Sequence, residues 1–170
     1  MTEPCSVHVK LAKEAIEAAF SGGKVSPLQA HELTLPAACF VSLHMTDGAL
    51  RGCIGTLEPR KSSLYEEIIA NSLSAAFHDP RFEPLRQEEL GHLYISVDVL
   101  HVPEPIASAE ELDPLIYGVI VERGNRRGVL LPNLPSIATV DRQLAIAKSK
   151  AGIGAEEKVT LYRFMVDRYF

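Results

Sequence analysis

Residues 37–56 of the chain read AACFVSLHMTDGALRGCIGT, and this stretch decides the fold. Alternating side chains over residues 38–45 are typical of a strand, and residues 50–56 have the character of a returning strand. Between them, Asp47-Gly48 has the composition of a tight hairpin turn. The segment therefore predicts an antiparallel hairpin.

A two-residue turn would fix how the two strands of this hairpin pair. It would place His44 opposite Arg51 and Ser42 opposite Cys53. In that register the apolar side chains share one face of the hairpin, and these four side chains share the other. A register shifted by one residue would bury Arg51 among apolar side chains, so the hydrophobic pattern favours the two-residue turn. Since Cys39 lies on the apolar face, we expect no disulfide between it and Cys53.

Further elements are expected on both sides of the hairpin. They are a helix at 6–20, a helix from Ser63 to Asp79-Pro80, a strand at 93–100, a hairpin at 117–131 turning through 124–127, a helix at 140–151 and a strand at 159–166. No internal repeat is visible in the sequence. Hairpins mixed with separate helices predict an α+β fold with a largely antiparallel sheet and flanking helices, in a single domain over residues 1–170.

Composition limits the class of protein. The chain has 170 residues, of which 46% are hydrophobic and 23% charged, close to the globular average. No apolar run approaches the roughly 18 residues that a membrane span requires, and residues 1–10 lack the apolar core of a signal peptide. We therefore expect a cytoplasmic protein without membrane contact, whose three cysteines stay reduced.

Charge is spread unevenly along the chain. Residues 1–112 hold 8 Lys and Arg against 16 Asp and Glu, whereas residues 113–170 hold 9 against 6. The net charge of −5 argues against a basic nucleic-acid-binding surface over the whole protein. The basic last third is still compatible with a local surface of this kind. We do not expect a nucleic-acid partner, and the sequence does not determine the oligomeric state.

Cys53 is the candidate nucleophile of the hairpin. In the predicted register it has Ser42 opposite it, and His44 lies on the diagonal at about 7–8 Å. A cation such as the neighbouring Arg51 lowers the pKa of a thiol, and His44 could act as the base. The alternative is that Cys53 only packs, because the sequence shows no third group that would orient a catalytic pair. Whether the protein is an enzyme therefore stays open.

A second candidate site joins the hairpin to the segment HDPRF at residues 78–82. Arg51 and Arg81 have planar guanidinium groups that can each donate two hydrogen bonds to a carboxylate or phosphate. Gly52 offers open backbone to a ligand, and Asp79 can orient one of the guanidinium groups. These residues predict a pocket for a small anionic ligand. The alternative is that both arginines are held in internal salt bridges.

No motif supports a metal or a cofactor. The pair Cys5-x-x-His8 lacks the second pair of ligands that a zinc site needs. A Gly-rich phosphate loop is also absent from the sequence. We therefore expect no metal ligands and no cofactor.

The second strand of the hairpin reads LRGCIG at residues 50–55 and is followed by TLEP at 56–59. Further motifs are AAF at 75–77 with DPRF at 79–82, RGVLLP at 127–132 and KAG at 150–152. In this order they resemble the signature of the AMMECR family, whose members are also called AmmeMemoRadiSam system protein A. The resemblance implies an α/β fold with a larger and a smaller lobe, and a role beside a Memo-like protein and a radical SAM protein.

The chain departs from the family pattern in one helix. Lys148 stands where the family often has a cysteine, so chemistry that needs a second thiol from that helix is in doubt. Taken together, the residues and the resemblance predict a cytoplasmic component that binds a partner or a small anionic ligand around the LRGCIG strand. The alternatives are a cysteine-dependent enzyme that uses Cys53, and a nucleic-acid-binding or regulatory protein.

Overall fold

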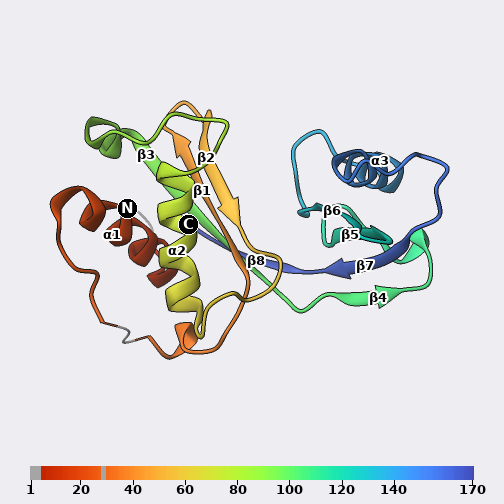
Figure 1. Cartoon of the computed structure of the whole chain (residues 1–170), viewed down its shortest axis with the longest axis horizontal. Helices are drawn as coiled ribbons and strands as arrows, with labels where there is room; N and C mark the ends of the chain where they lie inside the picture. The colour runs from red at the N-terminus through yellow and green to blue at the C-terminus, as the bar shows by residue number, and fades with distance from the viewer. Residues whose placement is uncertain (1–4, 28–29) are drawn as a thin grey trace. The chain divides into compact units, whose positions relative to one another are not determined.

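The structure is a computed structural model that describes residues 5–27 and 30–170. Its described part combines α-helices and short 3₁₀ helices with two mainly antiparallel sheets, which confirms the α+β prediction (Figure 1). The chain forms two compact units: unit 1 comprises the residues up to Leu100 together with Asp167–Phe170, and unit 2 comprises His101–Val166. Within the described ranges, no helix is long and apolar enough to cross a membrane.

Unit 1 places two helices on one face of a four-stranded sheet. The strand order is β2-β1-β3-β8, with bounds Cys39–Met45 (β1), Leu50–Gly55 (β2), Leu93–Leu100 (β3) and Val166–Tyr169 (β8). Helices α1 (Val7–Ser21) and α2 (Leu64–Phe77) pack against each other and against the sheet (Figure 1). The strand that carries the LRGCIG motif, β2, is therefore an edge strand.

Unit 2 packs one helix on a second four-stranded sheet. The strand order is β4-β7-β5-β6, with bounds Glu104–Ile106 (β4), Gly118–Arg123 (β5), Arg126–Leu130 (β6) and Thr160–Phe164 (β7). Helix α3 (Val140–Lys150) packs on β5 and β6. The hairpin predicted at 117–131 is confirmed, but its turn is the residue pair Gly124-Asn125, and Gly124 adopts a φ of 60°.

The helices begin at the residues that local chemistry favours. Ser6, Ser63 and Thr139 are the N-caps of α1, α2 and α3, and each side chain accepts a hydrogen bond from a backbone N–H three residues further on. Gly22 ends α1 in the left-handed region, at φ 69°. The three predicted helices are therefore confirmed.

The two sheets share one topology. In each unit a hairpin is followed by a helix, and the next strand pairs antiparallel with the first strand of the hairpin. The fourth strand of each sheet is the continuation of the third strand of the other unit. β3 runs on into β4, which pairs with β7, and β7 runs on into β8, which pairs with β3.

This exchange of strands corrects the prediction for the C-terminal segment. The single strand expected at 159–166 is two strands that belong to different sheets. The short strand β4 was not predicted, because Pro103 and Pro105 indicated that the preceding strand ends in a loop. β4 is an edge strand, where a proline is tolerated.

The turn of the β1–β2 hairpin differs from the prediction. The Met45 N–H donates to the carbonyl of Ala49 at 2.8 Å, so the turn contains the three residues 46–48 rather than two. Gly48 adopts a φ of 90°, a region that the last residue of such a turn requires and glycine readily occupies.

A β-bulge compensates for the longer turn. His44 pairs with Leu50 instead of Arg51, and the register shifts by one residue before the next pair. Arg51 is thus the extra residue on β2. The predicted pairing of His44 with Arg51 is wrong, whereas the predicted pairing of Ser42 with Cys53 is confirmed.

Two glycines allow the helices to approach the sheets. A Cβ atom on Gly52 would lie 2.2 Å from the carbonyl oxygen of Ala75 in α2, and one on Gly128 would lie 1.9 Å from that of Ala147 in α3. Neither distance admits a carbon atom, so a side chain at either position would force the helix away from its sheet. Both glycines lie in the second strand of a hairpin.

We predict that Gly52→Ala lowers the free energy of unfolding by about 2 kcal/mol or more, because overpacking a rigid backbone contact costs on the order of 1–3 kcal/mol. Gly91→Ala is the matched control, since a Cβ there meets no atom within 4 Å and its φ is not positive. Urea denaturation followed by circular dichroism compares the two variants with the parent. Equal midpoints for both variants would contradict the steric role of Gly52.

Candidate functional site

Cys53 projects from β2 on the sheet face that points away from α2, because its neighbour Gly52 faces that helix. Ser42 Oγ donates a hydrogen bond to Cys53 Sγ at 3.2 Å. Burial raises the pKa of the Cys53 thiol, while the Ser42 hydrogen bond and the charge of Arg81 act in the opposite direction. A raised pKa favours the protonated thiol over the nucleophilic thiolate at neutral pH.

The backbone of Cys53 is clamped at the open edge of the sheet. Its N–H donates to Asp79 Oδ2 at 3.0 Å, and its carbonyl accepts a hydrogen bond from Arg81 Nη2 at 3.2 Å. The two side chains thus occupy hydrogen-bonding positions that a further strand would use. Because the Asp79-Pro80-Arg81 segment follows directly after α2, the end of the helix brings the clamp to the strand.

Asp79 and Arg81 also form a bidentate ion pair. Arg81 Nε lies 3.0 Å from Oδ1, and Nη2 lies 2.8 Å from Oδ2. The Asp79 side chain is 2% exposed, whereas that of Arg81 is 56% exposed. The hydrogen bonds from Arg81, assisted by the Cys53 N–H, hold the pKa of Asp79 well below its usual range despite burial. The buried carboxylate therefore stays ionised and holds an exposed guanidinium in place.

Arg51 has a partner of its own. Its Nε and Nη2 atoms lie 2.8 and 3.0 Å from the two carboxylate oxygens of Glu89, and its side chain is only 14% exposed. The ring of Phe82 lies beside both arginines, with its centroid 6.0 Å from Arg51 Cζ and 5.5 Å from Arg81 Cζ. Both arginines of the predicted anion site thus have internal salt bridges, and the more exposed one is Arg81.

His44 makes a contact that the sequence did not indicate. Its ring stacks on Tyr94 with the centroids 5.0 Å apart. Its Nδ1 atom is buried and has no hydrogen-bond partner among the described residues. Burial, followed by the charge of Arg168, lowers the pKa of His44, so the imidazole is neutral at neutral pH. The observed hydrogen-bond donor to the Cys53 sulfur is Ser42, not His44.

Sequence reasoning missed an ion pair on the same face of this sheet. Arg168 on β8 donates from Nε and Nη2 to both carboxylate oxygens of Asp98 on β3, at 2.6 and 3.0 Å. The Asp98 side chain is 4% exposed, and its charge contributes to raising the pKa of Cys53. The available signal was a single carboxylate in the alternating strand at residues 93–100, but nothing in the local pattern identified its partner.

The three cysteines carry free thiols. Cys39 is buried on the helix side of the sheet beside Asn71, where burial raises its pKa to about 12. It therefore lies on the opposite face from Cys53, as the hairpin pattern predicted. Over residues 5–27 and 30–170, no group of three or more His, Cys, Asp or Glu side chains is placed to hold a metal ion.

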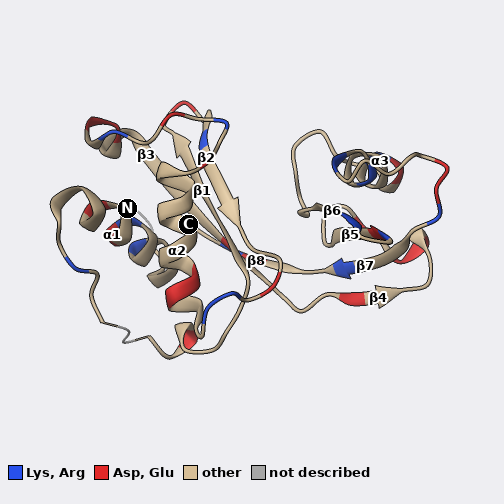
Figure 2. Cartoon of the chain, viewed as in Figure 1, with Lys and Arg blue, Asp and Glu red and all other residues tan. Residues whose placement is uncertain are grey.

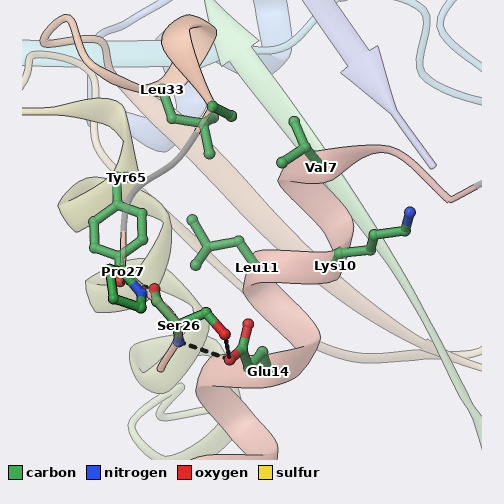
Figure 3. Close-up of a pocket in the computed structure, with 9 residues that line it drawn as sticks. Val7, Lys10, Leu11, Glu14, Ser26, Pro27, Leu33 and Tyr65 are labelled. Atoms are coloured by element: carbon green, nitrogen blue, oxygen red, sulfur yellow. Dashed lines mark hydrogen bonds between the residues drawn. The ribbon is translucent and has the colours of Figure 1, made fainter. Parts of the chain in front are cut away.

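A cavity of about 330 Å³ lies elsewhere in unit 1, between α1, α2 and the connection that follows α1. Ser26 forms part of its wall and is held by both helices. Its N–H and Oγ donate to Glu14 at 2.7 and 2.6 Å, and its carbonyl accepts from the Tyr65 hydroxyl at 2.5 Å. Figure 3 shows Glu14 turned toward Ser26 beside the apolar Leu11. The residues that line this cavity include none of the predicted site residues.

Comparison with known proteins shows close relatives. The AMMECR1 family model matches residues 9–169. A protein of Thermotoga maritima is 52% identical over 134 residues, which cover 78% of this chain and 77% of that protein. The protein CA_C1420 of Clostridium acetobutylicum is 44% identical over 167 residues, which cover 95% of this chain but 35% of that longer protein. The crystal structure of the uncharacterised protein PH0010 from Pyrococcus horikoshii matches with a TM-score of 0.85 and 32% identity, over 95% of this chain and 88% of that one.

Asp79→Asn is expected to lower the free energy of unfolding by about 2–3 kcal/mol at neutral pH, because the buried partner of Arg81 loses its charge. The pKa of Asp79 is lower in the folded than in the unfolded protein. Its stabilisation is therefore present above the unfolded pKa of about 3.9 and is lost as the pH falls below that value. Urea titrations from neutral to acid pH should show the difference between parent and variant shrinking.

Glu83→Gln removes one negative charge from an exposed residue of the same segment and serves as the control for Asp79→Asn. It should leave the pH dependence unchanged. A pH-independent difference between the parent and Asp79→Asn would show that the carboxylate charge is not what stabilises the clamp.

Cys53 should react slowly with iodoacetamide at neutral pH, and faster as the pH rises, because the raised pKa keeps it protonated. Ser42→Ala removes a hydrogen bond that lowers this pKa, so it should slow the reaction further at a given pH unless it also exposes the sulfur. Peptide mass spectrometry after timed labelling measures the rate at each cysteine, with Cys5 as the internal reference. If Cys53 were labelled at neutral pH faster than an unfolded thiol, its pKa would not be raised, and the interpretation of Cys53 as an activated nucleophile would be supported.

Proposed function

Because the chain belongs to the AMMECR1 family, we propose that it is a cytoplasmic binding component that acts with a Memo-like protein and a radical SAM protein. Its binding site is the LRGCIG strand, β2, together with the segment that clamps it. The group that it recognises is an anion, either a carboxylate on a partner protein or the acidic group of a small ligand.

The observation that carries this proposal is the state of Arg81. Three hydrogen bonds, two to Asp79 and one to the carbonyl of Cys53, fix its guanidinium beside the strand. These bonds use Nε and Nη2, and the side chain remains 56% exposed. The outer nitrogen, Nη1, is therefore presented to another molecule in a fixed orientation. A donor that is already ordered loses little conformational entropy on binding, which favours affinity.

Arg51 has a different part in this proposal. Its side chain is 14% exposed and both of its bonded nitrogens face Glu89. We therefore assign the contact with the anion to Arg81, and we assign Arg51 the task of holding the segment after α2 against β2. We assign Gly52 a packing role instead of a contact with the ligand, because the carbonyl of Ala75 in α2 fills the space over its Cα atom.

A second candidate function is a cysteine-dependent enzyme that uses Cys53. The Ser42 hydrogen bond and the nearby charge of Arg81 favour the thiolate and so support this candidate. Burial outweighs both influences, and His44 stacks on Tyr94. The binding role is the better supported of the two, since it needs no ionised thiol.

The test measures binding of the purified protein to a purified Memo-like protein and a purified radical SAM protein of the same organism. Isothermal titration calorimetry should detect binding to at least one of them. Arg81→Ala should weaken it at least about tenfold, because a charge-assisted hydrogen bond contributes about 1.5–3 kcal/mol. Arg81→Lys should be intermediate, since lysine keeps the charge but not the planar fork.

Lys61→Ala removes an exposed cation from the same unit and is the matched control; it should bind as the parent does. Cys53→Ser should also bind as the parent does, whereas the enzyme candidate requires this variant to lose turnover. Absence of binding by the parent to either protein, or equal binding by Arg81→Ala, would overturn the proposal.

A further inference from the structure

A polar cavity lies in unit 2, far along the sequence from the clamp on β2. Its volume is about 410 Å³, and it is formed where β5 ends and β7 begins. The side chains and backbone that line it are those of Glu122, Arg123, Gly124, Lys158, Val159 and Thr160. In Figure 2, acidic and basic residues follow each other on the connection from α3 into β7.

Arg123 is held at this cavity in a fixed position. Its Nη1 donates to the carbonyl of Lys158 at 2.7 Å, and its Nε lies 3.2 Å from a carboxylate oxygen of Glu157. The side chain is nevertheless 45% exposed. Like any arginine, it has five N–H donors, so these two contacts leave donors for a further acceptor.

The cations around the cavity outnumber the carboxylates that contact them. Glu157 is shared between Arg123 and Arg126, whose Nη2 lies 2.8 Å from the same carboxylate oxygen. Glu122 forms an ion pair with Arg127 at 3.2 Å. The ammonium of Lys158 has no hydrogen bond or ion pair with any described residue. Residues 122–127 and 156–160 carry four cations against three carboxylates, Glu156 included, so this segment has a small net positive charge.

The backbone at the cavity leaves room for a ligand. Gly124 has a φ of 60°, and a Cβ there would meet no atom within 4 Å, so the rim is open. On the neighbouring strand, the exposed residue Thr160 pairs with Glu122 at the end of β5 and lines the cavity. A hydroxyl and a backbone without a side chain are groups that accompany cations in sites for oxyanions.

We propose that this cavity binds the phosphate group of a small phosphorylated molecule. Arg123 supplies the oriented guanidinium, the exposed Lys158 supplies an ammonium and Thr160 supplies a hydroxyl donor. A phosphate group has several acceptor oxygens and a negative charge that complements the net positive charge of this segment. The site is independent of the β2 clamp and does not rest on the function proposed for it.

The test uses inorganic phosphate and pyrophosphate as probes, titrated into ¹⁵N-labelled protein at constant ionic strength. Amide resonances of residues 122–124 and 158–160 should shift and saturate with both probes. Lys158→Ala should weaken the binding at least about tenfold, in line with the loss of one charge-assisted contact. Its melting temperature should not change, because the side chain stabilises nothing else among the described residues.

Arg142→Ala is the matched control, because it removes an exposed cation from α3 of the same unit. It should bind both probes as the parent does. Equal weakening by Lys158→Ala and Arg142→Ala would show non-specific attraction of anions and overturn the proposal. So would shifts that do not saturate, or a single-stranded oligonucleotide that binds far more tightly than pyrophosphate, since the latter would assign the surface to nucleic acid.

Discussion

The fold of unit 1 depends on the approach of one carbonyl to one glycine. The oxygen of Ala75 in α2 lies 2.2 Å from where a side chain on Gly52 would begin, so the helix can lie on β2 only because residue 52 has no side chain. This contact sets the height of the last turn of α2. Four residues later the chain reaches Asp79, whose carboxylate meets the N–H of Cys53. The packing of α2 on Gly52 therefore also positions Asp79 to bind the backbone of the edge strand β2.

Unit 2 solves the same problem in the same way, although no repeat is visible in the sequence. Gly128 admits the carbonyl of Ala147, and the residue after each glycine has its outward carbonyl capped by a cation: Arg81 on Cys53 and Lys150 on Val129. Little more than an Arg-Gly pair is shared in sequence. The constraint in both units is the close approach of a helix carbonyl to a strand backbone. It requires a glycine at one position and leaves most other residues free to differ between the two units.

Local chemistry explains how much of the fold the sequence predicts. Caps such as Ser63 and alternation along residues 93–100 act within a few residues, so the helices and most strands were predicted. The bulge at Arg51 was not, because it cancels the extra turn residue and leaves the pairing of Ser42 with Cys53 intact. Ion pairs between residues far apart in the sequence were also not predicted. Nothing near Arg51 indicates that its partner is Glu89, 38 residues away. The structure brings Asp79 and Arg81 to β2, as the sequence suggested, but the hydrogen bonds and ion pairs within this cluster were not predicted.

The continuation of each third strand into the sheet of the other unit has a consequence for synthesis on the ribosome. β8 is translated after all of unit 2, yet it is the outer strand of the sheet in unit 1. Until it emerges, β3 has an unpaired edge, and the buried carboxylate of Asp98 lacks Arg168. An open strand edge invites pairing with other chains. The edge of β3 therefore stays open until β8 has left the ribosome and paired with it, and a chain truncated before β8 keeps that edge permanently.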